Sequence, residues 1–176
     1  MKERGKLLMN TVVTTVMSNF GLYKALDKAG IRYEKTAVGD RYVYENMKEN
    51  DFMIGGEQSG HMILLDHNST GDGLMTACQF LAAVIRSGKP VAEAIQVMEK
   101  MPQTLINVRV NDKHAVEDSA EVAAAVASAE EALGEAGRVL LRPSGTEPVV
   151  RVMVEAASAE EADRHAQACL LYTSDA

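Results

Sequence analysis

Residues 11–38 read TVVTTVMSNFGLYKALDKAGIRYEKTAV, and they determine which kind of sheet this chain can build. Residues 11–17 are rich in β-branched side chains, which favours a strand. Ser18 is expected to cap a helix that ends at Gly30, and residues 31–38 are expected to form a second strand. Because the two strands are joined by a helical crossover, the stretch predicts a βαβ unit with parallel strands.

The pattern of alternating strands and helices continues to about residue 100. Asp40 is expected to cap a helix that runs to about Asn50, and a third strand is expected at Phe52–Ile54. A glycine-rich turn at residues 55–60 then separates the third strand from a fourth strand at 61–66. An apolar helix at about 74–86 and another from Pro90 to about Lys100 follow. The sequence thus predicts an α/β fold, with a partial α/β/α mixed-sheet domain over residues 1–100.

Pro102 marks the expected boundary, and a different pattern begins after it. Two capping boxes are predicted, one at Asp118 and Glu121 and one at Ser158 and Glu161. The elements expected in chain order are a strand at 104–110, a helix to about 133, a strand at 137–141, a loop at 142–148, a strand at 149–155 and a helix to about 170. This β-α-β-β-α order predicts a small α+β domain over residues 101–176.

The composition excludes several classes of function. Hydrophobic residues make up 47% of the 176 residues and charged residues 24%, which is typical of soluble globular proteins. The net charge of −7 and the lack of a basic run argue against nucleic-acid binding. No apolar run reaches the ~18 residues that a membrane span needs. Cys78 and Cys169 show no metal-ligand spacing, so two reduced thiols in a cytoplasmic protein are expected.

The loop RPSGTEP at residues 142–148 has the chemistry of a phosphate site. A guanidinium fork matches two phosphate oxygens, hydroxyls donate further hydrogen bonds, and a glycine lets backbone N–H groups approach closely. The negative charge of the whole chain requires such a site to be local. The alternative is a plain hairpin turn with a solvated arginine. The residues expected to bind phosphate are Arg142, Ser144, Gly145, Thr146 and, more weakly, Arg151.

The loop GGEQSGH at residues 55–61 has the chemistry of a sugar-binding turn. Glu57 and Ser59 would lie on one side of an extended segment, where a carboxylate can accept protons from neighbouring sugar hydroxyls. The alternative is a glycine-rich turn with a solvated glutamate. Further residues that could lie near a substrate are Asp40, Arg41 and His61.

Other familiar motifs are absent from the sequence. There is no GxxxxGK[ST] phosphate loop and no GxGxxG dinucleotide fingerprint. Asp66 and Asp72 stand apart, so no aspartate cluster predicts a magnesium site. No catalytic residue and no metal ligand is therefore assigned within this chain.

Two of these loops together resemble the α-D-phosphohexomutase superfamily. GEQSGH at 56–61 resembles its sugar-recognition loop, and RPSGTEP at 142–148 resembles its phosphate-binding loop. Their order and their separation of about 85 residues are those expected. VGDRYV at 38–43, LLDHNSTGDG at 64–73 and LLRPSGTEPVVRVMVE at 140–155 are similar to the phosphoglucosamine mutase branch.

The resemblance implies a four-domain enzyme, of which this chain matches most of domain III, without its N-terminal part, and all of domain IV. A phosphoserine enzyme would interconvert glucosamine 6-phosphate and glucosamine 1-phosphate through glucosamine 1,6-bisphosphate, with Mg²⁺ stabilising the moving charge. The phosphoserine loop and the domain II metal loop have no counterpart in this chain. It is therefore expected to be inactive alone and to contribute phosphate and hydroxyl contacts to a hexosamine phosphate.

Two other functions remain open from the residues. One is a phosphomannomutase/phosphoglucomutase, which would act on a different hexose. The other is a non-catalytic module that binds sugar phosphates.

Overall fold

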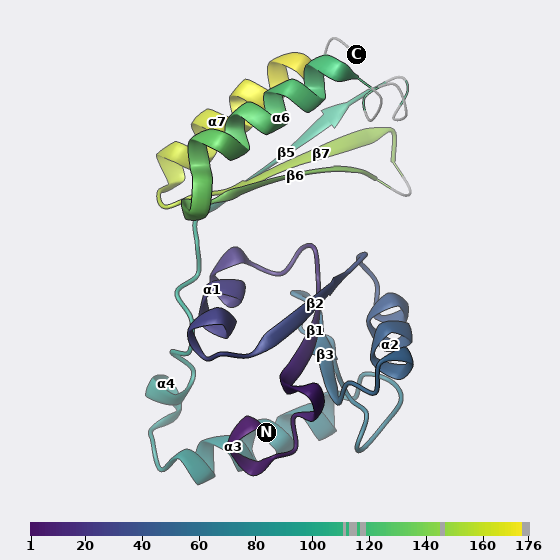
Figure 1. The fold of residues 1–176 in the computed structure, drawn as a ribbon, viewed down its shortest axis with the longest axis vertical. Coiled ribbons are helices and arrows are strands. Elements are labelled where there is room, and N and C mark those ends of the chain that lie inside the picture. The colour runs from purple at the N-terminus through teal and green to yellow at the C-terminus, as the bar shows by residue number, and fades with distance from the viewer. Residues whose placement is uncertain (111, 113–115, 117–118, 145–146, 174–176) are drawn as a thin grey trace. The chain divides into compact units, whose positions relative to one another are not determined.

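The computed structural model describes residues 1–110, 112, 116, 119–144 and 147–173, with side chains described as far as residue 170. The chain divides into two compact units, Met1–Lys100 and Met101–Ala176 (Figure 1). Each unit contains its own sheet and its own hydrophobic core. The predicted α/β fold class is confirmed, and each unit is described by itself below.

The N-terminal unit is built on a four-stranded sheet with the order β2-β1-β3-β4. β1 pairs in parallel with both β2 and β3, and β3 pairs antiparallel with β4. The predicted βαβ unit is therefore present. The strands are β1 (Thr11–Thr15), β2 (Arg32–Thr36), β3 (Ile54–Gly56) and β4 (Met62–Leu64).

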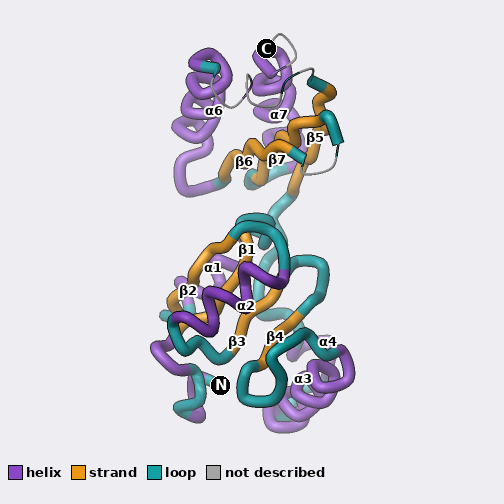
Figure 2. Tube along the Cα trace, turned by 90° about the vertical axis from the view of Figure 1, so that its right-hand side faces the viewer, coloured by secondary structure: helices purple, strands orange, loops and turns teal. Residues whose placement is uncertain are grey.

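Helices α1 to α4 accompany this sheet (Figures 1 and 2). The core forms where Val43 and Met47 of α2 pack with Val13 of β1 and Ile63 of β4, and Phe52 completes it. The helices are α1 (Phe20–Lys28), α2 (Asp40–Glu49), α3 (Gly73–Ser87) and α4 (Val91–Ala94), and the short 3₁₀ turns are η1 (Lys2–Arg4) and η2 (Leu8–Asn10).

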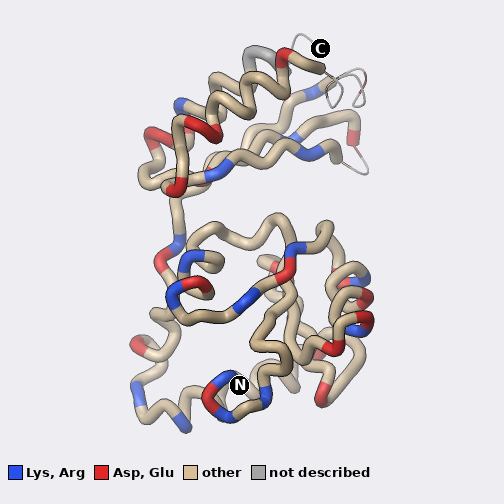
Figure 3. Tube along the Cα trace, viewed as in Figure 1, with Lys and Arg blue, Asp and Glu red and all other residues tan. Residues whose placement is uncertain are grey.

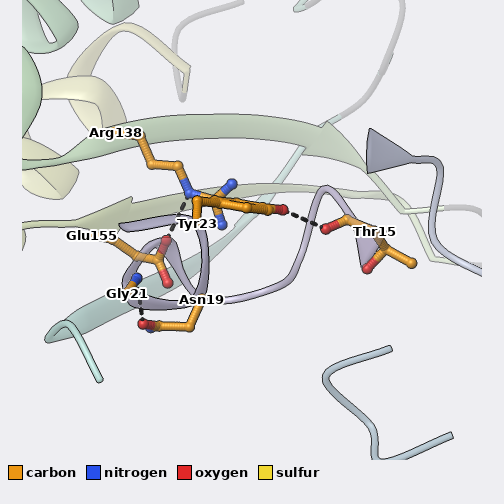
Figure 4. A network of polar contacts seen from close by, with 6 residues as sticks. All are labelled: Thr15, Asn19, Gly21, Tyr23, Arg138 and Glu155. Atoms are coloured by element: carbon orange, nitrogen blue, oxygen red, sulfur yellow. Dashed lines mark hydrogen bonds and ion pairs between the residues drawn. The ribbon is translucent and has the colours of Figure 1, made fainter. Parts of the chain in front are cut away.

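Hydrogen bonds at the start of α1 differ from the expectation. Asn19 caps α1, because its side chain accepts a hydrogen bond from Gly21 N at 3.0 Å, so the prediction of Ser18 as the cap was wrong (Figure 4). Tyr23 of the same helix donates its hydroxyl to the carbonyl oxygen of Thr15 at 2.8 Å, which ties α1 to the end of β1. As expected, the helix stops before Gly30, whose φ of +60° favours glycine.

Further boundaries in this unit differ from those predicted. The cap of α2 is Gly39, and Asp40 is the first helical residue, because the backbone at residue 39 has φ +133°. The third strand begins at Ile54 and includes Gly55, which pairs with Ile63. Helix α4 ends at Ala94 instead of Lys100. It buries none of its residues, and short helices gain most of their stability from burial.

The C-terminal unit has the predicted β-α-β-β-α order. Its sheet is antiparallel with the order β5-β7-β6, and helices α6 and α7 cover one face (Figure 2). Val108, Val152 and Val154 belong to the core against these helices. The elements are β5 (Gln103–Arg109), α6 (Ala120–Leu133), η3 (Gly134–Ala136), β6 (Arg138–Pro143), β7 (Val149–Glu155) and α7 (Ala159–Thr173).

Polar contacts define the ends of these elements. Ser119 caps α6, because its Oγ accepts a hydrogen bond from Val122 N at 3.3 Å. The capping box predicted at Asp118 and Glu121 is therefore wrong in position. Asp118 itself lies outside the described residues. Ser158 accepts from Glu161 N at 3.1 Å, as predicted. Arg138 and Glu155 lie directly opposite on β6 and β7 and form an ion pair at 2.6 Å (Figure 4).

Two remaining observations concern the cysteines and the membrane. Cys78 is exposed on α3, whereas Cys169 is buried in α7, and this burial raises the pKa of its thiol. Within the described part of the chain, no helix combines the length and the apolar character that crossing a membrane requires.

Gly55→Ala should destabilise the N-terminal unit by about 1–3 kcal/mol, because a core position would be overpacked. A Cβ at residue 55 would lie 2.6 Å from Met47 Sδ and 2.7 Å from Val43 Cγ1. Urea unfolding of the chain measures the effect. Gly73→Ala is the control, because nothing lies within 4 Å of its added Cβ. Equal unfolding free energies for the two variants would show that α2 does not need the glycine.

Candidate functional site

The candidate residues of the N-terminal unit come from segments that follow parallel strands. Gly39, Asp40 and Arg41 follow β2, and Glu57 follows β3. Because the carboxyl ends of parallel strands lie at one edge of the sheet, the two segments meet there. Gly39 N donates a hydrogen bond to Glu57 Oε2 at 3.1 Å. The carboxylate of Glu57 thus lies at the N-terminal end of α2.

A tight turn presents the predicted sugar-binding residues. Glu57 N donates to the carbonyl of His61 at 2.9 Å, and Gly60 N donates to the carbonyl of Glu57 at 3.0 Å. Gly60 has a φ of +95°, so the turn depends on glycine at this position. Ser59 is exposed at the tip, whereas Glu57 is half-buried at the base. The turn therefore holds Glu57 in place and leaves the Ser59 hydroxyl accessible to solvent.

His61 lies between Asp40 and the loop at residues 67–72 that precedes α3, which is called the glycine loop below. Its Nε2 atom is 3.6 Å from Asp40 Oδ2, which is too long for a hydrogen bond. A Cβ at Gly71 would lie 2.2 Å from His61 Cε1, so only a glycine allows the ring to sit there. His61 Nε2 is buried and makes no hydrogen bond within the described residues. The close approach of Gly71 thus fixes the imidazole in position.

An open pocket of about 620 Å³ adjoins this turn. Its wall is formed by the turn between β3 and β4, by the glycine loop and by the first turns of α3. Ser59 and His61 line it, and Asp72 lies at its edge, where the Asp72 carboxylate caps α3 by accepting from Met75 N at 2.9 Å. The pocket supplies a polar rim beside Phe80, a combination suited to a small polar ligand.

Arg41 makes a different contact from the other candidates. Its Nε donates to Glu45 Oε1 at 2.8 Å along the exposed side of α2. This hydrogen bond to Glu45 raises the pKa of the Arg41 guanidinium. The structure therefore brings Asp40, Glu57 and His61 together, whereas the Arg41 side chain is engaged on the helix surface.

The candidate phosphate residues of the C-terminal unit lie on the hairpin between β6 and β7. Arg142 is part of β6, so the prediction that the strand ends at Leu141 was wrong. The strand continues because Arg142 pairs with Arg151 and Pro143 with Val150, and Ser144 N donates to the carbonyl of Val149 at 2.9 Å. Gly145 and Thr146 lie outside the described residues.

Two guanidinium groups consequently face each other across neighbouring strands. Arg142 and Arg151 occupy directly opposite positions, which places both side chains on the same face of the sheet. Arg142 Nε is buried and has no hydrogen-bond partner within the described part of the chain. The arrangement concentrates positive charge at one end of the hairpin, as an anion site requires.

Glu147 is a residue whose role the sequence did not reveal. Its Oε2 lies 3.2 Å from Arg151 Nη2, and its backbone N donates to Ser144 Oγ at 3.2 Å. The four-residue spacing between Glu147 and Arg151 was visible in the sequence. However, the spacing indicates a contact only once the turn between β6 and β7 is known.

The charges outside these loops do not form a large field. Figure 3 shows acidic and basic residues interspersed along both units. The net charge of −7 would repel an anion at long range. An anion site on the β6–β7 hairpin therefore depends on short contacts with its own arginines.

The fold and the two loops together define the class of protein to which this chain belongs. Proteins of this class combine a mixed α/β unit, with a polar turn at its strand ends, and a small antiparallel sheet whose hairpin carries two arginines. Comparison with known families gives the same architecture in the same order. Residues 1–101 match phosphoglucomutase/phosphomannomutase alpha/beta/alpha domain III, and residues 105–170 match the phosphoglucomutase/phosphomannomutase C-terminal domain.

The chain therefore belongs to the phosphoglucomutase/phosphomannomutase family. It is 55% identical over 165 residues to a phosphoglucosamine mutase of Lachnospira eligens, covering 94% of this chain and 37% of that protein. It is 56% identical over 162 residues to that of Streptomyces coelicolor, covering 92% and 36%. It is 52% identical over 165 residues to that of Bacillus subtilis, covering 94% and 37%. The chain thus spans little more than a third of these relatives' length.

Solved structures share the fold at lower identity. N-acetylphosphoglucosamine mutase of Aspergillus fumigatus in complex with GlcNAc-6P and magnesium superposes with a TM-score of 0.81 at 21% identity, covering 94% of this chain and 38% of that one. A phosphoglucomutase/phosphomannomutase family protein of Burkholderia thailandensis gives 0.69 at 20% identity, covering 92% and 36%.

Gly71→Ala should displace the His61 ring, because the added methyl group would overlap it. We expect the imidazole nitrogen resonances of His61 to shift in long-range ¹H–¹⁵N NMR spectra, with a loss of about 1–3 kcal/mol of stability. Gly73→Ala, at the first residue of α3, is the control, since its Cβ meets nothing within 4 Å. Unchanged His61 resonances in Gly71→Ala would contradict the described packing of the ring.

Proposed function

We propose that this chain forms the sugar- and phosphate-binding part of a phosphoglucosamine mutase. The observation that carries the proposal is that both candidate loops lie within regions 52–56% identical to phosphoglucosamine mutases of three bacteria. In this proposal residues 1–100 correspond to domain III and residues 101–176 to domain IV of the family's enzymes. The ligand is a hexosamine phosphate, and the protein acts in the cytoplasm on precursors of UDP-N-acetylglucosamine and peptidoglycan.

The phosphate group is proposed to bind at the β6–β7 hairpin. Arg142 and Arg151 supply charge-assisted hydrogen bonds, and Ser144, Gly145 and Thr146 add hydroxyl and backbone donors. The opposition of the two arginines supports this assignment, because like charges at directly opposite positions disfavour a sheet unless an anion compensates them. The buried Arg142 Nε, which has no hydrogen-bond partner among the described residues, supports it further.

The sugar is proposed to bind at the turn between β3 and β4. Glu57 accepts hydrogen bonds from hydroxyl groups, and Ser59 donates or accepts beside it. The hydrogen bond from Gly39 N holds the Glu57 carboxylate in one orientation, which lowers the entropic cost of binding. Asp40 and His61 lie next to this turn and approach the same ligand, and Arg41 is proposed to lie nearby on α2.

The reaction proposed for the longer protein interconverts glucosamine 6-phosphate and glucosamine 1-phosphate. A phosphoserine enzyme transfers its phosphoryl group to the sugar, glucosamine 1,6-bisphosphate turns over in the site, and the other phosphate returns to the serine. This chain contributes by holding the phosphate that is not reacting, so that the sugar oxygen at the other end is positioned for transfer. The residues of the β6–β7 hairpin that bind this phosphate are called the phosphate anchor below. The same anchor serves both half-reactions, because either phosphate can bind to it.

Magnesium is proposed to act in a part of the longer protein outside this chain. Among the described residues, no three His, Cys, Asp or Glu side chains are grouped in a way that could hold a metal ion. The described residues of this chain therefore do not fit a magnesium site. In the complete enzyme it would stabilise the negative charge on the transferred phosphoryl group.

The 176-residue chain should show no mutase activity by itself, because the proposed phosphoserine and metal sites are not part of it. Incubation with glucosamine 6-phosphate and Mg²⁺, followed by ³¹P NMR, measures the formation of glucosamine 1-phosphate. The same mixture without protein is the blank. Glucosamine 1-phosphate above the level of the blank would refute the proposal that the phosphoryl transfer requires sites outside this chain.

Arg142→Ala should weaken the binding of inorganic phosphate roughly ten- to 150-fold, which corresponds to ~1.5–3 kcal/mol for a charge-assisted hydrogen bond. NMR titration of the ¹⁵N-labelled chain at constant ionic strength measures the dissociation constant. Arg164→Ala is the control, because it removes the same charge from an exposed position on α7. Equal losses in both variants would mean that Arg142 acts only through net charge.

A further inference from the structure

The carboxylate of Glu147 lies beside Arg151, one of the two arginines to which the proposed function assigns phosphate binding. Its Oε2 lies 3.2 Å from Arg151 Nη2. Its backbone N donates to Ser144 Oγ at 3.2 Å. One residue therefore contacts two of the groups to which the proposed function assigns phosphate binding, and it does so from within the loop that joins β6 and β7.

The charges of this hairpin explain why the contact forms. Arg142 and Arg151 face each other directly across β6 and β7, where like charges repel. Glu147 neutralises one of the two, and the neighbouring Arg142 Nε remains unpartnered within the described residues. A phosphate dianion would compensate both guanidinium groups, which a single carboxylate cannot do. The bound anion is therefore the better partner for the pair.

The Glu147–Arg151 contact is also weak enough to be exchanged. The side chain of Glu147 is 61% exposed and that of Arg151 is 32% exposed. Ion pairs in such positions contribute only ~0.2–1 kcal/mol, because water screens them and two side chains must be ordered. An incoming phosphate can thus displace the carboxylate at a small cost.

We propose that Glu147 is a tethered competitor for the phosphate anchor: its carboxylate holds Arg151 in the ligand-free protein and is displaced when phosphate binds. The inference rests on the proposed function, because it presumes that Arg142 and Arg151 bind phosphate. Glu147 is a positioning residue in this account. It acts through Arg151 and does not touch the ligand.

A competitor of this kind suits a bisphosphate that must turn over. The anchor has to release one phosphate and bind the other before the bisphosphate intermediate leaves the protein. When Glu147 returns to Arg151, the guanidinium is not left without a counter-charge, so release becomes easier. Affinity changes within one interface appear mainly in the dissociation rate, so Glu147 should speed phosphate release.

Glu147→Gln tests the proposal, because it keeps the size of the side chain and the backbone hydrogen bond to Ser144 but removes the competing charge. We expect inorganic phosphate to bind the full chain about two- to fivefold more tightly, as the strength of an exposed ion pair implies. NMR titration at pH 7.5 and constant ionic strength measures the dissociation constant. Circular dichroism verifies that the variant is folded.

Glu93→Gln is the matched control. It removes one negative charge from another exposed i,i+4 ion pair, Lys89–Glu93 at 2.9 Å, in the other unit. We expect its phosphate affinity to equal that of the wild type. Equal tightening in Glu93→Gln and Glu147→Gln would overturn the proposal, since the effect would then follow net charge alone.

A double-mutant cycle with Arg151→Ala separates competition from a structural effect. Glu147→Gln should tighten binding when Arg151 is present and leave the affinity unchanged when Arg151 is absent. Unchanged or weaker phosphate binding in Glu147→Gln, with binding that still depends on Arg142, would overturn the competitor role and leave the anchor intact. If phosphate binds neither the wild type nor Glu147→Gln, both the anchor and the competitor are wrong.

Discussion

The N-terminal unit depends on the position of β1 between two parallel neighbours. Val13 at its centre pairs with Glu34 of β2 on one side and with Gly55 of β3 on the other. Helix α2 packs so closely on β3 that a side chain at residue 55 would overlap Met47 and Val43. This close packing brings the start of α2 to the end of β3, where Gly39 N reaches the Glu57 carboxylate. The proposed sugar site is therefore a consequence of how the core is packed.

In the C-terminal unit, the strand register of the β6–β7 hairpin positions the residues of the proposed phosphate site. Pairing of Arg142 with Arg151 places two positive charges side by side, and the loop between the strands supplies Ser144 and Glu147. The core valines on the opposite face of the sheet fix this register, because a slip by one residue would expose them. An acidic protein can thus maintain a local anion site, because two arginines on one hairpin act on an anion at distances shorter than the ~10 Å over which dissolved salt screens charges.

The sequence was sufficient to predict the fold class and the order of the main helices and strands in both units, because β-branched or alternating stretches and helical stretches follow one another clearly along the chain. It could not predict that Asn19, and not Ser18, caps α1, since that choice depends on backbone angles at the helix start. It also missed that Gly55 belongs to a strand, because only the packing of α2 reveals this. The ion pair between Glu147 and Arg151 became visible only with the hairpin geometry. The roles of Glu57, Ser59, Arg142 and the other candidate residues remain predictions.

The proposed function assigns the hydroxyl groups of a hexosamine phosphate to the turn at residues 56–61 and its phosphate to the hairpin at residues 142–151. Titration of the ¹⁵N-labelled chain with glucosamine 6-phosphate, with the backbone amides of each segment followed by NMR, tests this assignment most directly. We expect the amides of both segments to shift. A segment whose amides stay unchanged would contradict the role proposed for that segment.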